Sequence, residues 1–323
     1  MGYSTWSDDF YRDRAATRKR DGVDTFAYHT ATASKPRDQR VVHASLDPKG
    51  VKVRESRDSR EHPNSLPIGV MLDVTGSMAS TPREVQAALP KLMGLVTKLT
   101  GITDQQILFG AIGDATCDQG SLQIGQFESG IEMENHLTNF WLEGGGGGSN
   151  QESYQNAMYF FARHTSTDCW EKRQKKGFLF LMGDEHPYDQ VRRTEVQRLF
   201  DCALQEDIPT TDLVKELQER YHVFFLIPRR ASNGSDPRLR AKWTGLLGDD
   251  HVLLVEDATV VSETIALAIG IVEKTADFSQ AFSALVEAGL SESAAHQVVE
   301  PLGPLAKACG VDLTFPTPRN LAL

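Results

Sequence analysis

The sequence predicts an α/β protein in which helices cover both faces of a mostly parallel sheet. Short apolar runs of strand length alternate with helix-length amphipathic stretches throughout residues 66–274. Several of the apolar runs end in acidic loops. Because the carboxyl ends of parallel strands meet at one edge of a sheet, these loops indicate where a ligand would bind.

The composition is that of an ordinary globular protein. The chain has 323 residues, of which 40% are apolar and 24% charged, enough for one large domain or two modest ones. The net charge of −10 is uneven, since residues 1–65 carry 13 Lys and Arg against 10 Asp and Glu. Residues 66–323 are therefore strongly acidic. This charge argues against nucleic acid as the primary ligand and favours the binding of divalent cations.

The cysteine pattern and the hydropathy predict a cytoplasmic protein. No C-x-x-C pair occurs, which excludes zinc ribbons and dithiol motifs and leaves reduced thiols as the expectation. No apolar stretch approaches the length of a membrane span, and the polar, acidic amino terminus lacks the pattern of a secretory signal.

Three parts are expected along the chain: a polar extension over 1–64, an α/β domain over 65–275 and a small helical segment over 276–323. Within the extension, the pattern favours a helix around 10–19 and short strands at 40–45 and 51–54. The mixed-charge run at 54–60 is expected to be a solvated linker.

The first core strand is expected at 68–72, followed by a helix over 83–99. Pro90 should kink or split that helix, and Gly101 should end it. The same patterning predicts further strands at 107–112, 122–126, 177–182, 222–227 and 251–255. Helices are expected over 128–141, 152–164, 190–205, 211–220, 237–247, 257–274, 278–288 and 291–300. The basic residues at 172–176 are expected to form a solvated turn.

A polar motif follows the first strand directly. Asp73, Thr75 and Ser77 alternate along the chain, so that one carboxylate and two hydroxyls can converge in a tight loop. Oxygen ligands of this hardness suit Mg²⁺ or Mn²⁺ rather than Zn²⁺.

Acidic loops follow two other predicted strands as well. Asp114 and Asp118 follow the second strand, and Asp184 and Glu185 follow the strand at 177–182. Carboxylates gathered at one edge repel one another unless a cation neutralises them. Together with Asp73, they predict a metal site at this edge.

The run Asp73-Val74-Thr75-Gly76-Ser77-Met78 resembles the D-x-[ST]-G-S-M signature of the von Willebrand factor A family, over residues 66–274. Five consecutive glycines, Gly144–Gly148, run into Ser149 and Asn150, and the form of this glycine-rich loop is similar to that of intracellular bacterial or phage-type branches. The resemblance implies a Rossmann-like fold and a metal-ion-dependent adhesion site holding Mg²⁺, or Mn²⁺ or Ca²⁺.

The resemblance assigns Asp73, Thr75 and Ser77 to the first metal loop and Asp184 to the position that closes the site. The family usually supplies its middle ligand from a threonine in a G-G-T stretch, which this chain lacks. The nearest equivalent is Ser149 in Gly147-Gly148-Ser149. The other candidates for this position, or for a neighbouring one, are Asn150, Glu152, Ser153 and Asp114.

The resemblance implies a non-enzymatic adaptor that binds a protein partner through the ion, with the partner contributing an Asp or Glu carboxylate. An AAA+ ATPase of the MoxR type is one class of partner that it implies. Two alternatives stay open: a metal-dependent PIN-like nuclease, and a scaffold with a degenerate metal site. Neither G-x-S-x-G, a P-loop nor H-x-x-x-H spacing occurs in the sequence.

Overall fold

The computed structural model describes residues 26–145, 148–276 and 278–311, together with Asp13, Ala16, Thr17 and Arg20. The helix expected around 10–19 lies outside the continuously described residues, and Gly147 of the glycine-rich loop lies outside them as well.

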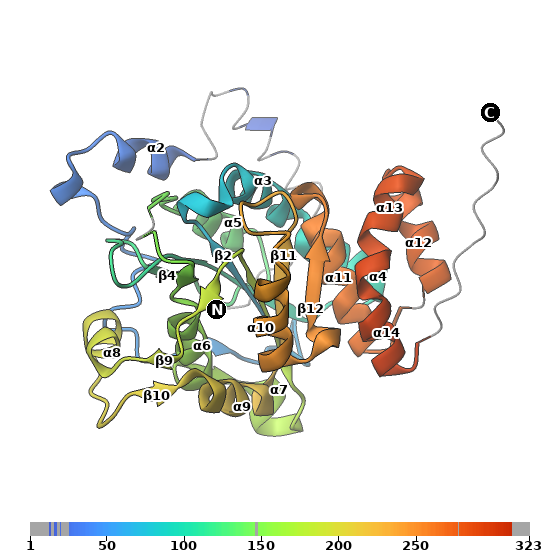
Figure 1. Ribbon diagram of the computed structural model, residues 1–323. Coiled ribbons are helices and arrows are strands. Elements are labelled where there is room, and N and C mark those ends of the chain that lie inside the picture. The colour runs from blue at the N-terminus through green and yellow to red at the C-terminus, as the bar shows by residue number, and fades with distance from the viewer. Residues whose placement is uncertain are drawn as a thin grey trace.

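A six-stranded sheet with the order β12-β11-β7-β2-β3-β4 forms the centre of the molecule (Figure 1). The pairs along β12, β11, β7, β2 and β3 are all parallel, and β4 runs antiparallel to β3 at one edge. The strands are β2 (Leu66–Asp73), β3 (Gln105–Ile112), β4 (Leu122–Ile124), β7 (Gly177–Met182), β11 (Tyr221–Pro228) and β12 (Val252–Val255). The mixed α/β, Rossmann-like fold class is therefore confirmed.

The direction of the chain across the sheet reverses between β2 and β7. From β2 the chain proceeds outward through β3 to β4, and it then returns to place β7 on the other side of β2. In doubly wound sheets, this switch point opens a crevice at the carboxyl ends of the two strands, where ligands bind.

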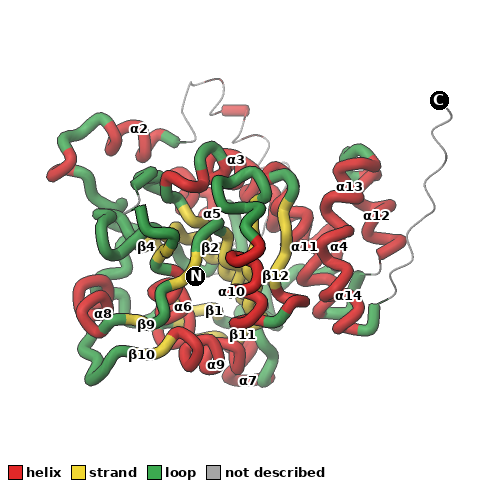
Figure 2. The backbone as a smooth tube through the Cα atoms, viewed as in Figure 1, coloured by secondary structure: helices red, strands yellow, loops and turns green. Residues whose placement is uncertain are grey.

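Both faces of the sheet are covered, because successive side chains of a strand point to opposite faces. In β7, Phe178 and Phe180 belong to one apolar core, whereas Leu179 and Leu181 belong to the other. The first core is covered by α3 (Thr81–Ala88), α4 (Leu92–Thr100), α5 (Glu132–Thr138) and α11 (Val261–Val272). The second is covered by α6 (Tyr154–Arg163), α8 (Arg193–Phe200), α9 (Thr210–Arg220) and α10 (Pro237–Leu247). Figure 2 shows these helices around the strands.

Most core elements match the sequence-based expectation, and β7 and α10 have the predicted bounds. Pro90 splits the predicted helix, since a short 3₁₀ turn, η3 (Leu89–Lys91), separates α3 from α4. The predicted start at residue 152 was wrong, because α6 begins at Tyr154 and Glu152 belongs to β5 (Gln151–Glu152). This short strand pairs in parallel with β8 (His186–Pro187).

The helix predicted at 190–205 was too long. Its first residues form β9 (Gln190–Val191), which pairs with β10 (Ile208–Pro209), and α8 ends where Asp201 adopts a left-handed conformation with φ of 56°. A strand pairing of this kind depends on residues distant along the chain, so local periodicity does not reveal it.

The segment before β2 is more tightly held than predicted. No strand forms at 40–45, and the strand expected at 51–54 instead forms β1 (Arg54–Ser56), which pairs with β6 (Thr165–Thr167). The run at 54–60 is not a solvated linker, because Arg57 and Asp58 bond to charged residues of α7 (Asp168–Arg173). Lys172 and Arg173 belong to that helix rather than to a turn, and both pair with Asp58.

The carboxyl-terminal helices pack against the first core beside α11 and α4, on the right-hand side of Figure 1. They are α12 (Phe278–Glu287), α13 (Glu292–Val299) and α14 (Gly303–Cys309), of which the sequence pattern had not predicted the last. At the opposite side of the view lies α2 (Ala27–Ala33). Within the described residues, no helix is both long and apolar enough to cross a membrane.

Candidate metal-binding site

The predicted metal ligands meet at the switch point of the sheet. Asp73 is the last residue of β2, and Asp184 follows β7 by two residues. These two strands are neighbours, with Leu72 opposite Met182, and both carboxylates are fully buried. The fold therefore brings together two acidic residues that are far apart in the sequence.

The loop after β2 folds back onto Asp73. The Oδ1 atom of Asp73 accepts hydrogen bonds from the Thr75 backbone nitrogen at 2.9 Å and from the Thr75 hydroxyl at 2.6 Å. Thr75 Oγ1 lies 3.3 Å from Ser77 Oγ. The alternating motif thus places one carboxylate and two hydroxyls side by side, as the sequence predicted.

Ser77 connects this loop to the next acidic residue. Its hydroxyl donates to Asp184 Oδ1 at 2.6 Å, and the backbone nitrogen of Asn233 donates to Asp184 Oδ2 at 2.9 Å. Ser232 donates its hydroxyl to the Ser77 carbonyl at 2.7 Å. The loop after β11 therefore supports the site, although no motif in the sequence indicated a role for it.

Tyr154 anchors the far side of Asp73. Its buried hydroxyl donates to Asp73 Oδ2 at 2.5 Å, while its ring packs edge-on against Phe225 and Trp243. Gly183 makes room for this contact, because a Cβ atom there would lie 1.9 Å from the tyrosine oxygen. In the sequence, Tyr154 has the pattern of an ordinary core residue of α6, and no signal distinguishes it.

Two further carboxylates join the cluster. Glu152 is 1% exposed and Glu185 is 7% exposed, and one oxygen of each, Oε2, is buried without a hydrogen-bond partner. The pairing of β5 with β8 brings the segments that carry them together. Buried oxygens of this kind cost free energy unless they are protonated or bound to a cation.

Burial, together with the neighbouring negative charges, raises the pKa values of these acids. Burial, and then the neighbouring charges of Asp73 and Glu185, raise the pKa of Glu152 from 4.5 to about 11. Burial and the charges of Asp73 and Asp184 raise the pKa of Glu185 from 4.5 to about 7. The pKa of Asp73 rises from 3.8 to about 7, mainly because it is buried, despite its hydrogen bonds from Thr75 and Tyr154.

The described part of the glycine-rich loop lies against the first metal loop. The backbone nitrogen of Gly76 donates to the Gly145 carbonyl at 2.8 Å, and that of Gly144 donates to the Val74 carbonyl at 3.1 Å. A side chain at residue 145 would collide with Asp118, whose Oδ1 atom lies 2.2 Å from the Cβ position. Glycine thus permits the close approach of the two backbones.

Asp114 and Ser149 form a separate, neighbouring cluster around Tyr188. The carboxylate of Asp114 accepts hydrogen bonds from Thr116 and from the Tyr188 hydroxyl, the latter at 3.1 Å and 3.2 Å. The hydroxyl of Ser149 lies 3.5 Å from that of Tyr188. Glu152 instead lies close enough to Asp73 for the charge of Asp73 to raise the pKa of Glu152.

The donor set fits a hard divalent cation. In the part of the chain that the structure describes, no three His, Cys, Asp or Glu side chains form a metal-binding group by themselves. The hydroxyls of Thr75 and Ser77 would therefore complete a set of oxygen donors. Such a set suits Mg²⁺, Mn²⁺ or Ca²⁺ better than a soft ion.

The pH dependence of the metal-free protein should reflect the raised pKa values. An acid whose pKa is higher in the folded than in the unfolded state lowers stability as the pH rises from the unfolded toward the folded value. Asp73, Glu152 and Glu185 all act in this direction. We expect the free energy of unfolding in EDTA to fall from about pH 4, steeply up to about pH 7 and then more gradually toward about pH 11, where Glu152 alone still contributes, and Mg²⁺ to restore it. Chemical denaturation across this range checks the expectation, and a flat profile in EDTA would contradict it.

Comparisons with known proteins identify similar folds only. No protein-family model and no curated protein matches the sequence. The pilus adhesin SpaC from Lactobacillus rhamnosus GG, in an open conformation, is similar at 10% identity and a TM-score of 0.45, over 66% of this chain and 31% of that one. Proximal thread matrix protein 1 from the mussel byssus is similar at 11% identity and a TM-score of 0.41, over 68% of this chain and 49% of that one.

A further structure of the byssus protein, with a zinc-occupied MIDAS motif, is similar at 11% identity and a TM-score of 0.41, over 63% of this chain and 46% of that one. The present chain therefore spans less than half the length of each of these proteins. At such identities and TM-scores, the likeness assigns no role to the residues of the site.

Proposed function

We propose that this protein is a non-enzymatic binding module that engages a protein partner through a divalent cation. The observation that carries the proposal is the cluster of Asp73, Asp184, Glu152 and Glu185 with the hydroxyls of Thr75 and Ser77. Among the described residues, none of these carboxylates forms an ion pair with a basic side chain. A cation is the simplest source of the missing positive charge.

The exposure of the loop favours binding to a partner over a purely structural ion. Asp73, Thr75 and Asp184 are buried, whereas Ser77 is half-buried and Gly76 is exposed. An ion held by these residues would therefore have one side toward the solvent. Mg²⁺ commonly keeps water on such a side, and an incoming ligand can displace it.

The resemblance of the motif suggests the nature of the partner. We propose that the partner contributes an Asp or Glu carboxylate to Mg²⁺, and that an AAA+ ATPase is one class of protein to test. We place this role in the cytoplasm, since the four cysteines, Cys117, Cys169, Cys202 and Cys309, are all free.

Ser77→Ala should abolish metal-dependent capture of the partner. Removal of the Ser77 hydroxyl takes away one oxygen ligand of the proposed ion. It also removes the hydrogen bond that links the loop after β2 to Asp184. We expect affinity capture from native lysate to retain a protein with wild type in Mg²⁺, and to lose it in EDTA or with Ser77→Ala. Calorimetry should show about tenfold weaker Mg²⁺ binding for the variant.

Ser80→Ala is the matched control. Ser80 lies three residues farther along and is exposed, and its hydroxyl donates to the Glu84 carboxylate rather than to any of the proposed metal ligands. The control should behave as wild type in both measurements. Equal capture under all conditions would count against metal-mediated adhesion, and Mn²⁺-dependent cleavage of RNA that Asp73→Asn abolishes would favour the nuclease alternative instead.

A further inference from the structure

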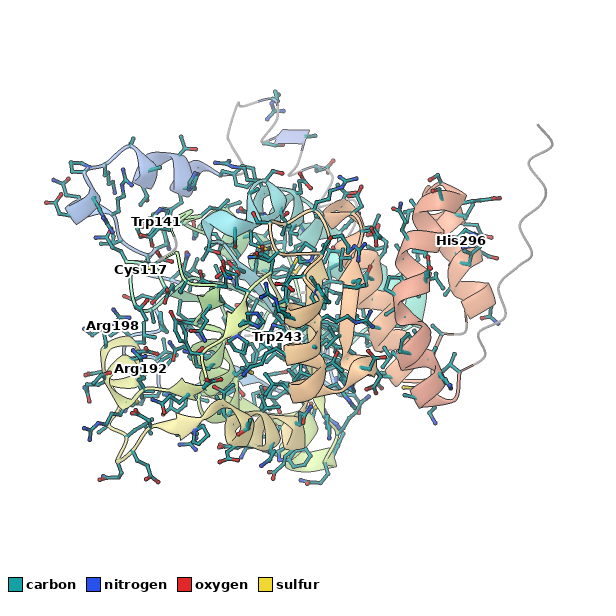
Figure 3. The ribbon with its side chains drawn as sticks, in the orientation of Figure 1. Cys117, Trp141, Arg192, Arg198, Trp243 and His296 are labelled. Atoms are coloured by element: carbon teal, nitrogen blue, oxygen red, sulfur yellow. The ribbon has the colours of Figure 1, made fainter. Side chains whose placement is uncertain are left out.

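Two adjoining hollows lie beside α8, and none of the residues of the proposed metal site lines either of them. The larger has a volume of about 400 Å³ and lies between α8 and the segment that precedes β1. The smaller, of about 340 Å³, lies between α8 and the loop after β3. Arg198 lines both. Figure 3 shows Arg198 and Arg192 along α8, on the left-hand side of the molecule.

Four basic side chains line these hollows without a carboxylate partner in the described structure. Arg40 and Arg198 bond only to backbone carbonyls, those of Lys35 and Ala115. Arg192 lies over the ring of Tyr188, 5.9 Å from its centroid, and the Lys49 ammonium has no partner among the described residues. All four residues lie on the surface, and they are not consumed by internal ion pairs.

The acidic residues in the same hollows are occupied internally. Asp47 accepts a hydrogen bond from the Lys49 backbone nitrogen, and Asp118 accepts one from that of Asp114. Glu195 accepts one from the side chain of Asn156. Their charges are therefore partly compensated, whereas the guanidinium groups and the ammonium remain able to bind an anion.

An exposed apolar residue borders the larger hollow. Val41 is 57% exposed, and the structure has only one other exposed large apolar side chain among the described residues, Val53. Val41 lines the hollow together with Val42, Pro48, Leu122 and Leu199. A ligand that covers this surface would therefore bury apolar area beside the basic groups.

We propose that these hollows bind an acidic segment of a protein partner that also carries apolar side chains. Carboxylates would pair with Arg192, Arg198 and Lys49, while an apolar side chain would cover Val41. A protein segment fits better than nucleic acid, because three carboxylates and an apolar wall share the hollows with the basic groups. The surface requires no metal ion, and it is distinct from the site described above.

A labelled peptide of repeated Glu-Glu-Leu units, titrated by fluorescence anisotropy, tests the proposal on the full chain. We expect salt-sensitive binding that Arg198→Glu or Lys49→Glu weakens about tenfold, since each places a negative charge against the peptide. Val41→Ser should weaken it about threefold. Lys98→Glu, a charge reversal on the exposed part of α4, is the matched control and should leave binding unchanged.

Several outcomes would overturn the proposal. They are no binding by wild type, equal binding of a peptide with Gln in place of Glu, equal binding by the Arg198 and Lys49 variants, and stronger binding of a single-stranded oligonucleotide than of the peptide. Loss of binding in EDTA or with Ser77→Ala would assign the peptide to the cation site instead. If metal-dependent capture fails, the peptide titration still tests the basic hollows, so the two proposals are tested separately.

Discussion

Glu152→Gln is expected to stabilise the metal-free protein and, at the same time, to weaken its binding of divalent cations. Burial and the nearby carboxylates raise the pKa of Glu152 to about 11, so folding at neutral pH requires this residue to take up a proton. An amide has the shape of the protonated acid and avoids this cost. We expect the free energy of unfolding in EDTA to rise by about 2 kcal/mol at neutral pH. Mg²⁺ affinity should fall at least about tenfold, because an anionic donor is lost.

Glu263→Gln provides the contrast. Glu263 is also buried, but its carboxylate pairs with Lys91 at 2.8 Å. Replacing this carboxylate with a neutral amide should lower the free energy of unfolding and leave Mg²⁺ binding unchanged. Denaturation in EDTA and calorimetric titration with Mg²⁺ measure both quantities. If Glu152→Gln also lowers stability, or binds Mg²⁺ as wild type does, Glu152 is not part of the site.

Gly183→Ala should produce the largest loss of stability that a single methyl group can cause at this site. The added Cβ would lie 1.9 Å from the Tyr154 hydroxyl and 2.9 Å from Asp73 Oδ2. Tyr154 cannot move away easily, because its buried ring packs against Phe225 and Trp243. We expect a loss of about 3 kcal/mol in the free energy of unfolding, together with loss of Mg²⁺ binding.

Gly245→Ala is the matched control, since Gly245 lies in α10 with no atom within 4 Å of the Cβ position. It should be neutral or slightly stabilising. Tyr154→Phe removes the atom nearest to the new methyl group, so the double variant with Gly183→Ala should be more stable than the two single effects predict. Strict additivity would mean that the contact with Tyr154 is not the cause.

The sequence predicted the elements whose signals are local. The apolar run of β7 and the amphipathic pattern of α10, with Pro237 at its start, gave the bounds that the structure has. The position of Pro90 was sufficient to predict the break between α3 and α4. The motif from Asp73 to Ser77 follows directly on a buried strand, so its compact loop was predictable as well.

The features that the sequence did not predict depend on contacts between distant segments. Glu152 seemed to belong to the following helix, and only its pairing with the strand after β7 places it beside Glu185. Arg57 bonds to Asp168 and Glu171 of α7, more than a hundred residues away, so local sequence patterns predicted a solvated linker around it. The hydroxyl of Tyr154 acquires its role only because Gly183 leaves space for it.

The position of the site at the switch point also has a consequence for the order of folding. Its oxygen ligands would come from the end of β2 and the loop that follows it, from Asp184 after β7 and from β5, while the loop after β11 holds Asp184 in place. No single segment therefore carries enough ligands to hold an ion. The ion can bind only after the long-range pairing of β2 with β7 has formed, which is among the slow steps for a parallel sheet. A nascent or partly unfolded chain would therefore lack the proposed adhesive surface. Occupancy by the ion would then draw the population toward the completed native state by mass action.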